Sequence, residues 1–137
     1  MRKDSTAYSA PRPAWDKGDC SVRALSCAAG IPYAVASALL SARGREVRKG
    51  TQVALSDELY GAILGMRRVE MAEGMSLGEF AQIAQAGRFI VHKTGHAFAL
   101  VNGTVHDWEG TTSERTRITR VWKITEEARA KLERLAR

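Results

Sequence analysis

A cysteine, a histidine and an aspartate occur in this chain in the order that thiol chemistry uses. Cys20 stands at the predicted start of a helix, where partial positive charge favours the thiolate, the nucleophilic form of the side chain. His96 begins a predicted strand, and an imidazole can take the thiol proton and later give it to a leaving group. Asp107 lies on the next predicted strand and can hold that imidazole in one orientation. The three are therefore candidate catalytic residues.

A predicted hairpin brings His96 and Asp107 together. Asn102-Gly103 is a strong signal for a two-residue turn, which pairs Val101 with Thr104. Continuing that register puts His96 and Asp107 on the same face of the sheet as diagonal neighbours. Such neighbours lie about 7–8 Å apart at the backbone, within reach of longer side chains.

The helix that carries Cys20 is expected to cover residues 20–29. Asp19 can cap its start, and Gly30 can end it in a left-handed conformation. Apolar residues occupy nearly every side of this segment, which is typical of a helix in the centre of a domain. Arg23 is an exception, and we expect it to form a buried ion pair with an acid.

The remaining elements predict an α+β domain. Further helices are expected at 33–43, 56–64 (capped by Ser56), 76–86 (with a Ser76/Glu79 capping box) and 126–137 (capped by Thr125). Strands are expected at 88–93, 96–101, 104–108 and 118–124, with a short strand or irregular link at 66–71. Helices thus come first and an antiparallel sheet second. Residues 1–18 are expected to form an irregular arm, and residues 19–137 a single domain.

Two segments resemble motifs of the papain-like cysteine peptidase superfamily. Asp16-Lys-Gly-Asp-Cys-Ser-Val-Arg-Ala-Leu-Ser26 resembles the nucleophile motif of the ovarian-tumour-type deubiquitinases. It is also similar to the domain that cleaves leader peptides in bacteriocin transporters, and to small papain-like proteins of phages and bacteria. Gly95-His-Ala-Phe-Ala-Leu-Val101 followed by Asp107 resembles the base and orienting acid of papain-like peptidases. The resemblance implies a papain-like fold, in which the nucleophile helix packs on a C-terminal antiparallel sheet.

The match departs from both patterns before the nucleophile. Asp16 stands four residues before Cys20, where the deubiquitinase motif has its aspartate three residues before. Papain-like enzymes usually place an oxyanion-stabilising glutamine about six residues before the cysteine, and this chain has Ala14 there. The oxyanion role is therefore assigned to backbone amides near Cys20 and to no side chain.

These features favour a cysteine hydrolase, either a peptidase or an isopeptidase, that acts on a protein or peptide and needs no cofactor. Acyl transfer would use the same three residues. A different class of site would be a zinc centre made by Cys20, His96 and Asp107, with His92 as a further ligand. No short ligand pair at zinc spacing is expected on one turn or knuckle, which disfavours that interpretation.

The alternative is a papain-like module without catalysis, such as a phage protein that binds nucleic acid or partner subunits through a basic surface. The formal net charge is +6, which favours polyanionic partners. Two basic clusters contribute to it: Arg43, Arg45, Arg48 and Lys49, and then Arg115, Arg117, Arg120 and Lys123.

The sequence predicts a cytoplasmic protein, in a bacterium or in a phage-infected cell. No apolar run approaches the roughly 20 residues that span a bilayer, and no apolar segment follows Arg2 and Lys3 as in a signal peptide. Cys20 and Cys27 lie seven positions apart on one predicted helix, about 10 Å by helix rise. A disulfide needs less than about 7 Å between the Cα atoms, so both thiols are expected to be free, as in a reducing compartment.

Overall fold

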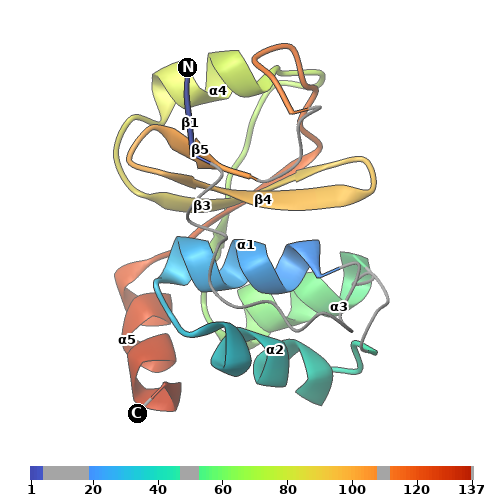
Figure 1. Cartoon of the computed structure of the whole chain (residues 1–137), viewed down its shortest axis with the longest axis vertical. Helices are drawn as coiled ribbons and strands as arrows, with labels where there is room; N and C mark the ends of the chain where they lie inside the picture. Colours follow the sequence, from blue (N-terminus) through green and yellow to red (C-terminus); the bar gives the residue numbers. More distant parts are fainter. Residues whose placement is uncertain (5–18, 47–52, 108–111, 137) are drawn as a thin grey trace.

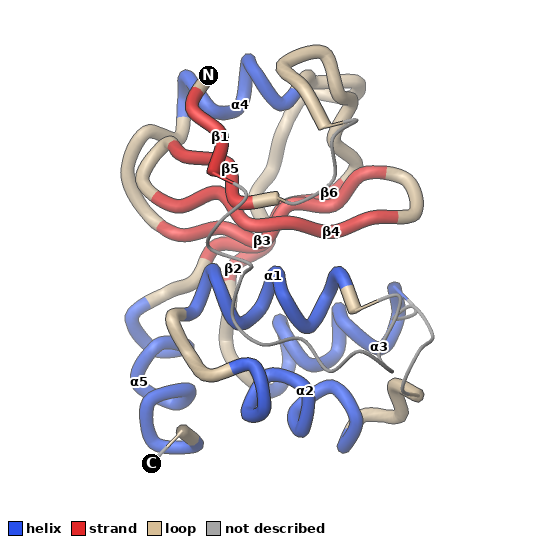
Figure 2. Tube along the Cα trace, in the orientation of Figure 1, coloured by secondary structure: helices blue, strands red, loops and turns tan. Residues whose placement is uncertain are grey.

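The protein has three layers in its computed structural model, which describes residues 1–4, 19–46, 53–107 and 112–136. A β-sheet forms the middle layer, with α4 (Leu77–Ile83) on one face (Figure 1). The other face is covered by α1 (Cys20–Ala29), with α2 (Tyr33–Ala42) packed against it (Figure 2). The same side holds α3 (Val53–Asp57), which continues as the π-helical segment η2 (Glu58–Ile63), and α5 (Glu126–Leu135). No described helix has the length and apolar character that crossing a membrane requires.

The sheet contains strands from both ends of the chain. In spatial order these are β1 (Arg2–Asp4), β5 (Thr104–His106), β4 (His96–Val101), β3 (Arg88–Lys93), β6 (Arg120–Lys123) and β2 (Arg67–Arg68). β1 pairs with β5 in parallel, whereas the other neighbours pair antiparallel. The α+β class is thus confirmed, with a mixed sheet in place of the expected antiparallel one.

Two apolar cores occupy the two faces of the sheet. The larger core lies between the sheet and the helices α1, α2, η2 and α5, on the face opposite α4. It includes residues such as Leu25, Leu40 and Tyr60. The smaller one lies under α4 and includes Phe80 and Phe98. Since Leu25 and Ala28 of α1 are fully buried, the helix lies centrally between the sheet and α2, as its apolar residues predicted.

Several expected boundaries are confirmed. α1 spans the predicted residues, and Gly30 follows it at φ 69° with its N–H donating to the Ser26 carbonyl. The Ser76/Glu79 capping box is present at the start of α4, and Thr125 accepts a hydrogen bond from the Ala128 N–H at the start of α5. Strands β3 and β4 have the predicted ends.

Other boundaries differ for physical reasons. Ser56 does not cap a helix, because α3 already begins at Val53 and Ser56 is buried within it. The helix expected to reach Ala86 ends at Ile83, since the chain then turns into β3 through Gly87 at φ 102°. Smaller differences are that α2 ends at Ala42, α5 at Leu135 and β5 at His106, and that β6 covers only 120–123.

The expectation for the first residues of the chain is also corrected. Arg2–Asp4 was expected in an irregular arm but forms the edge strand β1, which uses backbone hydrogen bonds to β5 and needs no apolar side chain. The rest of that expected arm, residues 5–18, lies outside the described part of the chain, together with 47–52 and 108–111.

Candidate active site

The start of α1 and the start of β4 lie close together at one side of the molecule, between the sheet and the helices below it (Figure 1). α1 packs along β4 and β3, and Cys20 is its first residue (Figure 1). The thiol of Cys20 is hydrogen-bonded to the imidazole of His96, the first residue of β4. Two further donors reach the Cys20 sulfur, namely the backbone N–H of Ala97 and the hydroxyl of Ser21.

The hairpin holds Asp107 behind the histidine. Its predicted register is confirmed, with Val101 opposite Thr104, and both turn residues, Asn102 and Gly103, have positive φ, as a type I′ turn requires. His96 Nε2 lies 2.9 Å from Asp107 Oδ1. Because Nε2 is bound to the carboxylate, Nδ1 is the ring nitrogen left for the thiol. The structure therefore brings all three sequence-predicted site residues into one hydrogen-bonded chain.

Burial and partners act in opposite directions on the two titrating groups. Burial raises the pKa of the Cys20 thiol, but the hydrogen bonds from His96 and Ala97 and the charge of His96 outweigh it and leave that pKa below its ordinary value. Burial lowers the pKa of His96, but hydrogen bonds to Asp107 and Cys20, with their negative charges, raise it to about 9. Both shifts favour a thiolate–imidazolium pair near neutral pH.

The ring of His96 is also fixed by packing. It stacks on Phe98, with the ring centroids 5.9 Å apart and an interplanar angle of 28°. The side chain of His96 is 8% exposed, and that of Asp107 is completely buried. A buried carboxylate beside a nearly buried imidazole has little competition from water, so the Asp107–His96 hydrogen bond is strong.

Asp19 does not act as the expected side-chain cap. Its Oδ2 accepts hydrogen bonds from Arg23 Nε at 3.0 Å and from the Tyr33 hydroxyl at 2.9 Å, and the helix start has no side-chain cap. The carboxylate binds the guanidinium in place of a backbone N–H of the helix start, because the charged group is the stronger partner. The buried ion pair expected for Arg23 is thus confirmed, with Asp19 as its acid.

Sequence reasoning missed the groups that surround the three residues. The Ala97 N–H is a backbone donor, and a backbone donor cannot be recognised from the type of its residue. Thr112 donates its hydroxyl to Asp107 Oδ2 at 2.5 Å, and no motif marks it. The position expected to hold a glutamine, Ala14, lies outside the described residues, as do Asp16 and Gly18.

The other two histidines do not join this site by hydrogen bonds. Burial and the neighbouring Arg120 lower the pKa of His92 to about 4, so His92 is neutral at physiological pH. His106 lies beside Asp4, with 3.9 Å between Nδ1 and a carboxylate oxygen. Among the described residues, no group of three or more His, Cys, Asp or Glu side chains is arranged to hold a metal ion.

Several arginines of the two basic clusters are engaged within the chain. Arg43 pairs with Glu58 at 3.3 Å, Arg120 pairs with Asp57 at 2.9 Å, and Arg45 is buried. Arg117 donates to the Gly74 carbonyl at 2.6 Å. These contacts reduce the charge that the clusters offer to a polyanion, and binding of nucleic acid stays a prediction.

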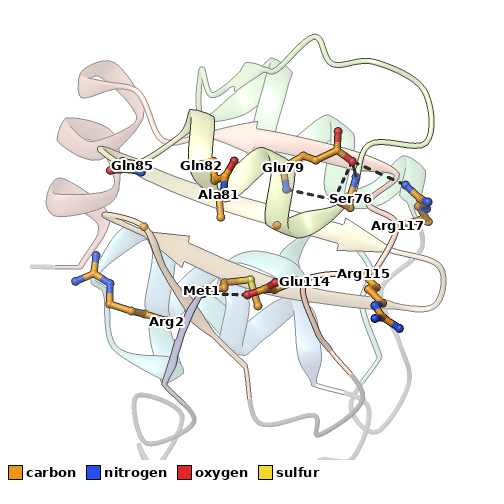
Figure 3. A pocket seen from close by; sticks show the side chains of 12 residues that line it. Met1, Arg2, Ser76, Glu79, Ala81, Gln82, Gln85, Glu114, Arg115 and Arg117 are labelled. Atoms are coloured by element: carbon orange, nitrogen blue, oxygen red, sulfur yellow. Dashed lines mark hydrogen bonds and ion pairs between the residues drawn. The ribbon is translucent and has the colours of Figure 1, made fainter.

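A polar hollow of about 800 Å³ lies on the far side of the sheet from Cys20. It is bordered by α4 and by the segment around Glu114, and Arg2, Glu79, Glu114 and Arg117 project along it (Figure 3). Its lining holds charges of both signs and neither of the two cysteines. The thiol chemistry therefore belongs to the opposite side, where α1 begins.

Comparison of the chain with protein-family models, curated proteins and solved structures gives no match. The functional assignment consequently depends on the geometry and electrostatics around Cys20.

Proposed function

We propose that this protein is a cysteine hydrolase of papain-like architecture that cleaves an amide or isopeptide bond in a protein or peptide. The observation that carries the proposal is the hydrogen-bonded chain from Cys20 through His96 to Asp107. Its members follow one another in the Cys–His–Asp order, on a helix start, a strand start and a strand end. That arrangement is similar to the papain-like one, which the sequence motifs suggested independently.

In the first half of the reaction, the Cys20 thiolate attacks the substrate carbonyl carbon and a sulfur–carbon bond forms. Negative charge develops on the carbonyl oxygen, where backbone N–H groups of the first turn of α1 can stabilise it, because a helix leaves them without intrahelical acceptors. The His96 imidazolium then gives its Nδ1 proton to the leaving amine, and the carbon–nitrogen bond breaks.

In the second half, His96 is neutral and accepts a proton from water as the water oxygen attacks the thioester carbon. The sulfur–carbon bond breaks, the acid product leaves, and the thiolate–imidazolium pair is restored. Asp107 keeps Nε2 as the hydrogen-bonded donor throughout, so that Nδ1 faces the sulfur at each step.

The direct test replaces each cysteine in turn. Cys20→Ala should reduce cleavage of a mixed peptide library by roughly 10³-fold or more and remove labelling by an electrophilic probe. Cys27→Ala is the matched control, since Cys27 lies on the same helix and has no histidine partner; it should keep cleavage and Cys20 labelling. Circular dichroism would verify that both variants fold.

Cleavage that persists in Cys20→Ala would contradict the proposal. So would a wild-type Cys20 that the probe labels no faster than a simple thiol at neutral pH.

A further inference from the structure

Thr112 contacts the oxygen of Asp107 that His96 leaves unused. Its hydroxyl donates to Asp107 Oδ2 at 2.5 Å, within the range of a charge-assisted O–H···O⁻ bond. Thr112 is 4% exposed and Asp107 is completely buried, so water does not readily replace this contact. The two carboxylate oxygens therefore have different fixed partners, His96 on one and Thr112 on the other.

The edge strand β1 holds both residues of this contact. Lys3 Nζ donates to the backbone carbonyl of Thr112 at 3.1 Å. The backbone N–H of Asp107 donates to the Asp4 carbonyl at 3.2 Å, which continues the parallel pairing of β1 with β5. Two adjacent residues of β1 thus connect to Asp107 and to its hydroxyl partner.

The contact matters because a carboxylate can rotate about its last bond. A hydrogen bond at Oδ1 alone leaves that rotation weakly restrained, and a buried ionised oxygen is stabilised by each donor that reaches it. A second donor at Oδ2 fixes the carboxylate plane and stabilises its charge. Both effects keep an anion directed at His96 Nε2.

We propose that Thr112 is a positioning residue, which holds the Asp107 carboxylate in the orientation that His96 requires, and that β1 presents Thr112 for this purpose. The inference rests on the proposed catalytic role of Cys20, His96 and Asp107. Thr112 acts through Asp107 and does not touch the reacting atoms.

The test measures how the rate of Cys20 alkylation by iodoacetamide depends on pH, because that rate follows the thiolate fraction. Thr112→Val keeps the branched shape and removes the hydroxyl. It should raise the apparent pKa of Cys20 by about one pH unit, since a less well held Asp107 stabilises the His96 imidazolium less. Thr112→Ser restores a hydroxyl and should return the profile to that of the wild type.

Asp107→Asn is the reference variant that distinguishes a failure of the role proposed for Thr112 from a failure of the proposed function. It removes the carboxylate charge and should shift the Cys20 profile at least as far as Thr112→Val. Titratable groups of the described residues that lie near Cys20, His96 and Asp107 are unchanged in every variant, namely Tyr60 from η2, His92 from β3, and Lys3 and Asp4 from β1.

A shift in Asp107→Asn with none in Thr112→Val would overturn the inference about Thr112 and leave the proposed function intact. No shift in Asp107→Asn would contradict the proposed function itself. Should Thr112→Val fail to fold, Thr112→Ala removes the same hydroxyl without filling the space, and the same shift is expected of it.

Discussion

The two cysteines of α1 show how differently one helix can treat the same side chain. Cys20 begins the helix, and its hydrogen bonds with His96 and the Ala97 N–H lower its pKa despite burial. Cys27 lies near the other end, where burial raises its pKa to about 11 and the nearby Arg88 charge only partly opposes that rise. Both thiols are free and both are half-buried.

The difference comes from what the sheet offers at each position. At Cys20, β4 supplies an imidazole and a backbone donor. At the other end, the guanidinium of Arg88 is hydrogen-bonded to the carbonyl oxygens of Cys27 and Ala28, at 3.4 and 3.2 Å. A position on a helix therefore does not by itself make a thiol reactive. The groups that β4 places beside the first turn of α1 lower the pKa of Cys20.

Removing the imidazole of His96 should have the largest effect on the difference between the two cysteines. His96→Ala should reduce hydrolysis by roughly 10²- to 10⁴-fold, the usual contribution of a general acid–base residue. It should also move the labelling profile of Cys20 toward that of an ordinary thiol. The measurement is the initial rate of peptide cleavage, with site-resolved mass spectrometry for the labelling.

His106→Gln is the matched control for that variant. His106 lies on β5, next to Asp107 in sequence, but has its contact with Asp4 and none with Cys20. It should leave the cleavage rate close to that of the wild type. An equal loss in both variants would mean that His96 has only a structural role.

A smaller effect is expected from the ion pair that fixes the start of α1. Asp19 and Arg23 are 1% and 9% exposed, so Arg23→Met leaves a buried carboxylate without its guanidinium. The free energy of unfolding should fall by about 3 kcal/mol, because removing one partner of a buried pair is costly. Chemical denaturation followed by circular dichroism gives that value.

Arg129→Met is the control, since Arg129 and Glu133 form a pair of the same spacing on α5 that is largely exposed. It should cost no more than about 0.5 kcal/mol, as exposed helical pairs do. Similar losses in the two variants would contradict the view that the Asp19–Arg23 pair is important for the start of α1.

The sequence predicted the parts of the site that local patterns control. The Asn102-Gly103 turn determines a hairpin register, and that register is enough to put His96 and Asp107 on one face. The apolar faces of residues 20–29, ending at Gly30, likewise determine a central helix.

What could not be predicted depends on contacts between distant segments. Arg2–Asp4 has no apolar residue and becomes a strand only because β5 offers it backbone partners. Asp19 has the residue type of a cap, but Arg23 and Tyr33 bind its carboxylate instead. η2 lies directly on Trp122 at Gly61, where an added Cβ would come within 2.9 Å of the indole, a packing that no local pattern indicates.

The central claim is tested most directly by the pH dependence of alkylation at the two cysteines of the wild-type protein, measured site by site by mass spectrometry. The reaction at Cys20 should reach half its maximum below the ordinary thiol pKa, because the His96 imidazolium, with its pKa near 9, stabilises the thiolate. Cys27 should react appreciably only toward pH 11, since burial disfavours its thiolate. The same profile at both cysteines, or slower reaction of Cys20 at neutral pH, would contradict the account.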